Sequence, residues 1–235
     1  MTECVDFLLF YKYRFTTVSI TMQAVCKTFF GTGGFGDNGL MSMAQSLGLI
    51  GNFHITADGT GVGGGIILDG KILTGTTGGA GEIGHMPVGL NETECCGCGN
   101  KGCLEQYASA TGIVKVAKKI LAECDTETPL RNMEGFSAKD VMDLAKAGDQ
   151  VAIDVIEQLG DYLGKALAHI ACVVNPSAFV IGGGVSKAGE MLFDYIRPHY
   201  EKYVFHGSKN TKFALATLGN DAGIVGAARL VLEQD

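Results

Sequence analysis

Positive charge is scarce in this sequence of 235 residues, which has 18 lysines and arginines against 25 aspartates and glutamates and a formal net charge of −7. Nucleic acids and anionic membranes are held mainly by Lys and Arg, so this balance argues against both as partners. No apolar run approaches the ~20 residues that a membrane-spanning helix needs. We therefore expect a globular protein with other ligands.

The start of the sequence is a poor match to a secretion signal, because MTECVDFLLFYKYRF places Glu3 and Asp6 ahead of a very short apolar patch. We therefore expect a cytoplasmic protein, in which the clustered thiols among eight cysteines bind metal rather than form disulfides. Prolines are few, 4 against 35 glycines. This ratio points to the tight strand-to-helix turns of an α/β fold, which is often associated with phosphate binding.

The organisation of the sequence changes near residue 59. Residues 1–58 contain glycine clusters but no sustained helical or strand period, and we expect an irregular segment there. From residue 59 on, GTGVGGGIILDGKILTG predicts a glycine turn, a strand at 65–68, an Asp-Gly turn and a second short strand. Together these elements would form a β-hairpin.

Helical patterns follow. We expect two successive helices at 104–109 and 112–124, and a third that begins at Ser137, with Asp140 three residues on as a capping box. A long helix is predicted at 149–174. Its buried stripe would consist of Ile156, Leu159, Leu163, Leu167, Ile170 and Val174.

The last third of the sequence repeats a pattern of strand, glycine turn and helix. We expect a strand at 177–181, the glycines of IGGGVS and a helix at 191–203. A strand at 213–218 and a closing helix at 222–232, joined by a turn, complete the chain.

One short stretch, residues 84–105 (GHMPVGLNETECCGCGNKGCLE), holds a histidine and four cysteines. Four thiolate or imidazole donors suit a closed tetrahedral Zn²⁺ site with a structural role. Glycines between the donors would let the backbone fold tightly round the ion. The expected ligands are His85, Cys96, Cys98 and Cys103.

Other interpretations of this stretch fit less well. Redox-active thiols would favour a CxxC pair on a helix, whereas this sequence has CxC. A nucleic-acid zinc finger would need more than one short lobe and more basic surface. Cys95 is left over, most simply as an exposed thiol, although it could compete with Cys96 as a ligand.

Glycines and isolated polar residues leave several alternatives open. GTGVGGG fits a plain hairpin turn or a phosphate contact, while IGGGVS favours anion binding because it follows an apolar strand and precedes a helix. Glu82, in GGAGEIGH, would usually be a solvated turn residue. His169, among apolar residues in a helix, is expected in the core or in an interface rather than as a ligand.

Two adjacent blocks identify a family resemblance. GTGVGGGIILDGKILTGTTGGAGEIGHMPV, followed by CCGCGNKGCLEQYASATG, resembles the ROK family (repressors, open reading frames and sugar kinases), and within it the bacterial glucokinases. IGGGVS and LGNDAGIVGAA fit the same family. The resemblance covers a ROK sugar kinase domain over residues 59–235, about three-quarters of the chain.

The resemblance implies an α/β fold of the actin and hexokinase (ribonuclease H-like) type, with ATP and sugar on two sides of a cleft between lobes. It also implies a structural Zn²⁺ on the four ligands named above, Mg²⁺ with the ATP, and a homodimer. Sugar hydroxyls would be bound by Glu82, His85 and Glu105. The ATP-binding residues would include Thr60, Gly61, Gly182, Gly183 and Gly184.

The function implied is ATP-dependent phosphorylation of the 6-hydroxyl of glucose, in which a base deprotonates the hydroxyl for in-line attack on the γ-phosphate. ROK repressors share the zinc and sugar blocks, so a sugar-sensing transcriptional regulator is the alternative. Such regulators carry a basic helix-turn-helix, and residues 1–58 show no such pattern. An inactive kinase remnant is a third interpretation.

The sequence departs from the family in residues 1–58. The Asp-x-Gly-Gly-Thr strand that cradles ATP phosphates and the Asn-Asp-Ala-Asn segment that carries the general base are both missing. Asp58 and Asp37 are weak substitutes, so the catalytic base stays unassigned. VSITMQ, residues 18–23, can be encoded so that a shifted frame reads Val-Asp-Asn-Asp-Ala. We therefore hypothesise a frameshift or a wrong gene start upstream of residue 59, which leaves the N-terminal lobe incomplete.

Overall fold

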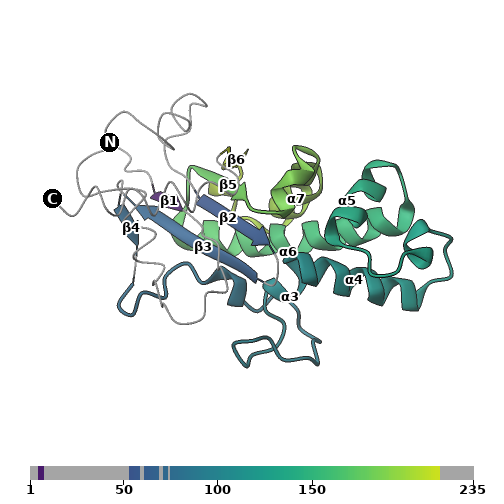
Figure 1. Cartoon of the computed structure of the whole chain (residues 1–235). Helices are drawn as coiled ribbons and strands as arrows, with labels where there is room; N and C mark the ends of the chain where they lie inside the picture. Colours follow the sequence, from purple (N-terminus) through teal and green to yellow (C-terminus); the bar gives the residue numbers. More distant parts are fainter. Residues whose placement is uncertain (1–4, 8–52, 59–60, 69–70, 74, 218–235) are drawn as a thin grey trace.

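A computed structural model of the chain describes residues 5–7, 53–58, 61–68, 71–73 and 75–217 (Figure 1). These residues form a mixed α/β fold, and none of their helices combines the length and apolar character needed to cross a membrane. Several predictions fall outside the described residues: those on Asp37, on Thr60, on 18–23 and on 219–232.

Within the described residues the sheet has six strands in the order β1-β3-β2-β5-β6, with β4 also paired to β3. Their bounds are β1 Val5–Phe7, β2 Phe53–Asp58, β3 Gly61–Leu68, β4 Lys71–Leu73, β5 Ala178–Gly182 and β6 Lys212–Leu215. Strands β2, β5 and β6 run parallel, while β3 runs antiparallel to β2. The end of β2, the start of β3 and the end of β5 therefore share one edge, because Asp58 pairs with Gly61 and Thr56 with Gly182.

The predicted hairpin is confirmed in its pairing but not in its first turn. Strands β3 and β4 are antiparallel, with Ile67 opposite Ile72. The glycine turn was wrong for residues 61–64, which form the first half of β3. Residues 53–58, expected to be irregular, form β2, a strand with neighbours on both sides. Its sequence, FHITAD, alternates apolar and polar residues over six positions, a strand signal that the sequence-based prediction missed.

The helices match their predicted positions to within a few residues. They are α3 Glu105–Ala108, α4 Ala110–Glu123, α5 Ala138–Lys146, α6 Gln150–Val174 and α7 Met191–Tyr203, with short 3-10 helices η1 Ile83–His85, η2 Pro129–Asn132, η3 Val185–Ala188 and η4 His206–Ser208. The predicted capping box of Ser137 and Asp140 closes the start of α5. The carboxylate of Asp149 likewise accepts a hydrogen bond from the backbone N–H of Ala152 at the start of α6.

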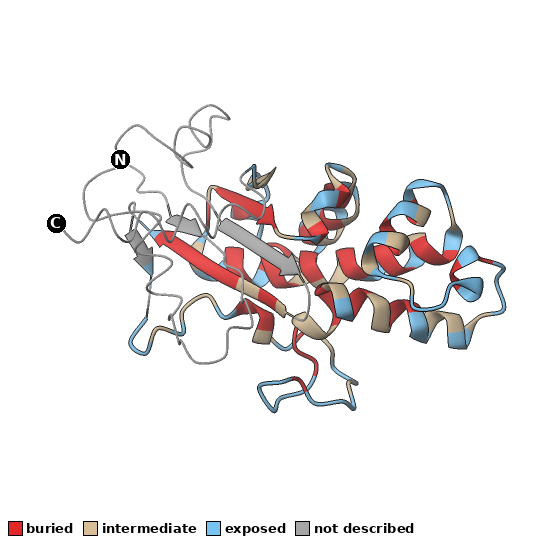
Figure 2. Cartoon of the chain, viewed as in Figure 1, coloured by how far each residue is buried: buried red, intermediate tan, exposed pale blue. Residues whose placement is uncertain are grey.

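Helix α6 is the centre of the core. It passes behind the strands and extends between α4, α5 and α7 (Figure 1). Its predicted stripe is buried except for the half-buried Val174 at its end (Figure 2). Gly160 and Gly164 let α7 approach closely, because a Cβ on Gly160 would lie 2.4 Å from the carbonyl oxygen of Tyr195. His169 is exposed, so the prediction of a place in the core was wrong, while the alternative of a place in an interface stays a prediction. It lies about 200° round the helix from the buried Leu167.

Candidate functional site

The segment that carries Glu82 and His85 lies directly on strand β3. A Cβ built on Gly64 would lie 2.0 Å from the carbonyl oxygen of Gly81, and one on Gly84 would lie 1.8 Å from that of Val62. No side chain fits at either contact, so glycine is needed where the two backbones touch. Gly64, within GTGVGGG, therefore serves this close approach rather than a turn.

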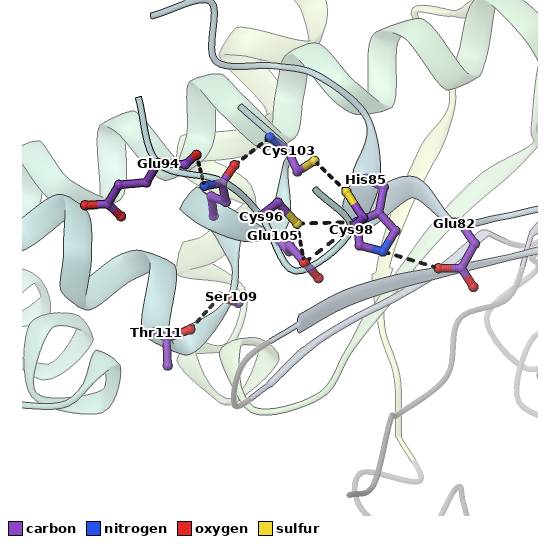
Figure 3. A network of polar contacts seen from close by, with 10 residues as sticks. Glu82, His85, Glu94, Cys96, Cys98, Cys103, Glu105, Ser109 and Thr111 are labelled. Carbon is purple, nitrogen blue, oxygen red and sulfur yellow. Dashed lines mark hydrogen bonds and ion pairs between the residues drawn. The ribbon is translucent and has the colours of Figure 1, made fainter. Parts of the chain in front are cut away.

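Helix η1 positions the polar residues Glu82 and His85, which flank the buried Ile83 and Gly84. Ile83 is only 5% exposed and anchors the helix, whereas the Glu82 and His85 side chains are 47% and 34% exposed. Nε2 of His85 lies 4.0 Å from Oε2 of Glu82. Figure 3 shows the imidazole between Glu82 on one side and the cysteines on the other.

The cysteine loop, residues 89–103, doubles back on itself through backbone hydrogen bonds. At its base the N–H groups of Val88 and Gly89 both donate to the carbonyl of Gly102, at 2.8 and 3.0 Å. At its tip the N–H of Cys96 donates to the carbonyl of Asn100 at 2.7 Å. Gly102 has a φ of 75°, a left-handed value that favours glycine. The fold of the loop brings three of its four cysteines, Cys96, Cys98 and Cys103, close together.

The four predicted ligands come together at the loop. Their ligand atoms all lie within 4.8 Å of one another; the residues are His85, Cys96, Cys98 and Cys103. Nδ1 of His85 is 3.6 Å from Sγ of Cys96, and the sulfurs of Cys98 and Cys103 are also 3.6 Å apart. A tetrahedral zinc with ~2.3 Å bonds to sulfur separates two sulfurs by about 3.8 Å, whereas a disulfide joins them at ~2.05 Å. The donor set and its spacing thus fit zinc and exclude a disulfide between Cys98 and Cys103. Cys95 is exposed and lies outside this group.

The three thiols differ in how readily they lose their protons. Burial raises the pKa of Cys96 to about 12, with the Glu105 carboxylate adding to the effect. Burial, with the neighbouring Cys98, raises that of Cys103, whereas the backbone N–H of Asn100 lowers the pKa of Cys98. A metal must therefore displace protons from Cys96 and Cys103, which makes its binding dependent on pH.

Glu105, the first residue of α3, joins this cluster to the sheet edge. The thiol of Cys96 donates to its Oε1 at 2.8 Å, and Nδ1 of His85 lies 3.7 Å from the same oxygen. A Cβ built on Gly61 would lie 3.4 Å from its Oε2. The three predicted sugar-binding side chains, those of Glu82, His85 and Glu105, are thus neighbours at the start of β3 (Figure 3).

The glycines predicted to bind ATP lie along the same edge of the sheet. Gly61 begins β3, and Gly182 ends β5 opposite Thr56. Gly183 has a φ of 82°, and Gly184 precedes η3, so the glycines lead into a four-residue 3-10 helix rather than straight into α7. The favourable interaction of phosphate with a helix N-terminus is therefore smaller than it would be at the start of a long helix. Ligands of open α/β sheets nevertheless bind at this edge, beyond the carboxyl ends of the strands.

A hollow of about 610 Å³ lies elsewhere, between α7 and β6. Arg197, Lys209 and Phe213 are among its lining residues, and none of the three predicted sugar-binding residues is. The candidate site is thus separate from this hollow, and in the part of the chain that the structure describes it is a grouping of polar side chains on the sheet edge.

Sequence reasoning missed a polar cluster behind the cysteine loop. Oε2 of Glu92 accepts hydrogen bonds from Nζ of Lys115 at 2.8 Å and from the hydroxyl of Tyr107 at 3.1 Å. The three residues are far apart in the sequence and belong to no shared motif, so only the fold reveals them.

Comparisons with known proteins identify the family of this chain. The sequence profile of the ROK family matches residues 51–234. A glucokinase of Halalkalibacterium halodurans is 46% identical over 189 residues, which make up 78% of this chain and 57% of that protein. The chain therefore spans little more than half the length of this relative.

Solved structures of both a kinase and a regulator resemble the chain. A ROK family glucokinase from Streptomyces griseus, solved with glucose and AMPPNP, has a TM-score of 0.67 and 34% identity, covering 88% of this chain and 66% of its own. A ROK family transcriptional regulator, a homolog of the E. coli MLC protein, has a TM-score of 0.70 and 30% identity, covering 89% and 49%.

Proposed function

The chain belongs to the ROK family, and on that premise we propose that it is part of an ATP-dependent glucokinase that phosphorylates the 6-hydroxyl of glucose. One observation carries the proposal: Glu82 and His85, from one segment, and Glu105, from another, gather at the edge of the sheet. Carboxylates accept hydrogen bonds from sugar hydroxyls, and an imidazole nitrogen can donate or accept. The group thus has the chemistry to orient a polyol.

The cysteine cluster is proposed to hold one structural Zn²⁺. Four protein ligands leave no open coordination position, so the ion would stabilise the site rather than activate water. With Nδ1 of His85 on the metal, its Nε2 carries the proton and points toward Glu82, ready to donate to a ligand. Cys96 as a thiolate no longer donates to Glu105, which leaves the Oε1 of Glu105 available to a sugar hydroxyl.

Phosphate binding and the base complete the proposed reaction. Backbone N–H groups at Gly61 and at Gly182, Gly183 and Gly184 would face ATP, with Mg²⁺ and these amides stabilising charge on the transferred phosphoryl group. Asp58 ends β2 at this edge, opposite Gly61. It remains a substitute candidate for the base rather than an assigned one. The homodimer and the cytoplasmic location stay predictions.

A sugar-binding regulator is the second candidate, because the similarity to the ROK transcriptional regulator is as strong in TM-score as that to the kinase. Both classes would use the same sugar-binding side chains. Glucose-dependent release of ADP from ATP, measured with the chain joined to an N-terminal lobe that carries Asp-x-Gly-Gly-Thr and Asn-Asp-Ala, distinguishes them, since only the kinase consumes ATP.

Calorimetric titration with glucose tests the sugar site. Glu82→Gln and Glu105→Gln should each weaken binding about 10- to 100-fold, because each removes a charged hydrogen-bond acceptor. Glu134→Gln, at an exposed carboxylate between η2 and α5, is the matched control and should bind as the parent does. Equal affinity of all four proteins for glucose would refute the assignment.

A further inference from the structure

The cysteine loop has almost no apolar core of its own. Every residue from 93 to 101 is exposed except Cys96, and Leu90 is 99% exposed. Backbone hydrogen bonds close the base and the tip of the loop, but they do not attach residues 90–95 to the helices beneath. Something else must hold this first half of the loop if Cys96 is to stay beside the other ligands.

Glu92 makes contacts that attach the first half of the loop to the helices beneath it. Its side chain is only 9% exposed, and its Oε2 accepts from both Lys115 and Tyr107. Its Oε1 accepts from the backbone N–H groups of Thr93 and Glu94, at 3.0 Å each. A carboxylate removed from water is tolerated when its oxygens are hydrogen-bonded, as they are here. Its position relative to the loop and to both helices is therefore tightly defined.

The partners of Glu92 lead directly to the candidate site. Tyr107 belongs to α3, two residues after Glu105, and its ring stacks on that of Tyr162 in α6 with centroids 4.1 Å apart. Lys115 belongs to α4. The carboxylate of Glu92 thus ties the loop to the helix that presents Glu105 and to the helix that follows.

A second side chain, that of Gln106, also attaches the loop to α3. The side chain of Gln106, next to Glu105 on α3, accepts from the backbone N–H of Cys103 at 3.0 Å and donates to the carbonyl of Glu94 at 3.1 Å. Both halves of the loop are thereby attached to α3. The carboxylate of Glu94 also reaches Lys115, at 2.9 Å, but it is 70% exposed and solvent competes for it.

We propose that Glu92 is a positioning residue for the metal cluster, which fastens the first half of the cysteine loop to α3 and α4 and so keeps Cys96 beside His85, Cys98 and Cys103. The expected effect of Glu92 on metal release rests on the proposed metal site, whereas the contacts that Glu92 makes do not. Glu92 itself touches neither metal ligand atoms nor sugar-binding side chains. Its effect passes through the backbone of the loop.

The test compares Glu92→Gln with Glu94→Gln in the full chain. Both variants remove one negative charge from the cysteine loop, and both take one carboxylate partner from Lys115. Only Glu92→Gln changes the buried carboxylate. The chain is loaded with Co²⁺ in place of zinc, and its thiolate absorption is followed as excess chelator removes the ion. Glu92→Gln should release cobalt about tenfold faster than the parent, while Glu94→Gln should stay within about twofold of it.

Hydrogen exchange of the metal-free chain separates this proposal from that of the metal site. Glu92→Gln should speed exchange in a peptide spanning 90–101 and leave peptides of α6 and α7 unchanged, whether or not metal is ever bound. A parent that binds no cobalt refutes the zinc proposal alone. Unchanged exchange at 90–101 in Glu92→Gln, or the same effect in Glu94→Gln, overturns the positioning role. Faster exchange throughout the chain also overturns it, because it would mean general destabilisation.

Discussion

The thiol of Cys96 donates a 2.8 Å hydrogen bond to Oε1 of Glu105, so a side chain of the metal cluster directly contacts a side chain of the proposed sugar site. His85 belongs to both groups, since Nδ1 faces Cys96 and Nε2 faces Glu82. The proposed metal site and the proposed sugar site therefore share His85 and are in direct contact at Cys96 and Glu105. A change in the metal cluster should therefore alter the affinity for sugar.

Loss of one cysteine should weaken glucose binding without removing any group that touches sugar. Cys98→Ser takes one donor from the cluster, so the chain should lose its metal and its glucose Kd should rise about tenfold or more. Cys95→Ser, at the exposed neighbouring thiol, is the control and should keep both. Metal content by mass spectrometry and calorimetry with glucose measure the two effects. A metal-free Cys98→Ser protein with parental affinity for glucose would show that the groups are not coupled.

The backbone contact between η1 and β3 should not tolerate a methyl group. Gly84→Ala would place a Cβ 1.8 Å from the carbonyl oxygen of Val62, and the strand must shift to relieve it. We expect a loss of about 1–3 kcal/mol or more in the free energy of unfolding, measured with urea. Gly97→Ala, where nothing lies within 4 Å of the new Cβ, should change it far less. Equal stability of the two variants would contradict the close contact.

Acid should destabilise the metal-free chain partly through Glu92. Burial raises its pKa, but hydrogen bonds from Lys115, the backbone of Glu94 and Tyr107 outweigh this and lower it from 4.5 to about 2. A depressed pKa means that the stabilisation is present above about pH 4.5 and is lost as the pH falls toward 2. The contribution is at most about 3 kcal/mol, and less because Lys115 is 36% exposed.

Urea unfolding in the presence of chelator, at about pH 6 and about pH 3, measures this dependence. Glu92→Gln cannot titrate at this position, so it should lose less stability than the parent between the two pH values. An equal loss of unfolding free energy in the parent and in Glu92→Gln would mean that Glu92 does not titrate as its contacts indicate.

Turnover by this chain is predicted to be poor or absent. Residues 1–58 lack both N-terminal motifs of the family. Loss of a general base typically costs about 10²- to 10⁴-fold in rate, and loss of the phosphate-cradling motif removes positioning as well. The same chain joined to an N-terminal lobe with Asp-x-Gly-Gly-Thr and Asn-Asp-Ala should release ADP in a glucose-dependent manner. Robust turnover by the unaltered 235-residue chain would show that its base lies at a position not named above.

Local sequence signals sufficed where short-range rules decide the structure. Ser137 and Asp140 form the predicted capping box, and the apolar spacing along α6 marks its buried stripe. The predicted ROK family and its actin- and hexokinase-like α/β fold are confirmed. The motif also named the residues that gather at the cluster, because the loop folds through its own glycines and backbone bonds.

Long-range relationships escaped prediction. The glycines of β3 were taken for a turn because their partner, the backbone at 81–84, is distant in the sequence. The contact of Glu92 with Lys115 joins residues 23 positions apart, with no periodicity to reveal it. The exposed position of His169 depends on which side of α6 meets the core, and apolar neighbours in sequence do not settle that.

Glucose binding by the metal-loaded and the chelated chain, compared by calorimetry at one pH, tests the central claim most directly. Glu82, His85 and Glu105 are proposed to bind the sugar in an arrangement that the metal cluster maintains. The loaded chain should therefore bind glucose, and removal of the metal should weaken the affinity about tenfold or more. Equal affinity in both states, or no binding by the loaded chain, would contradict the account.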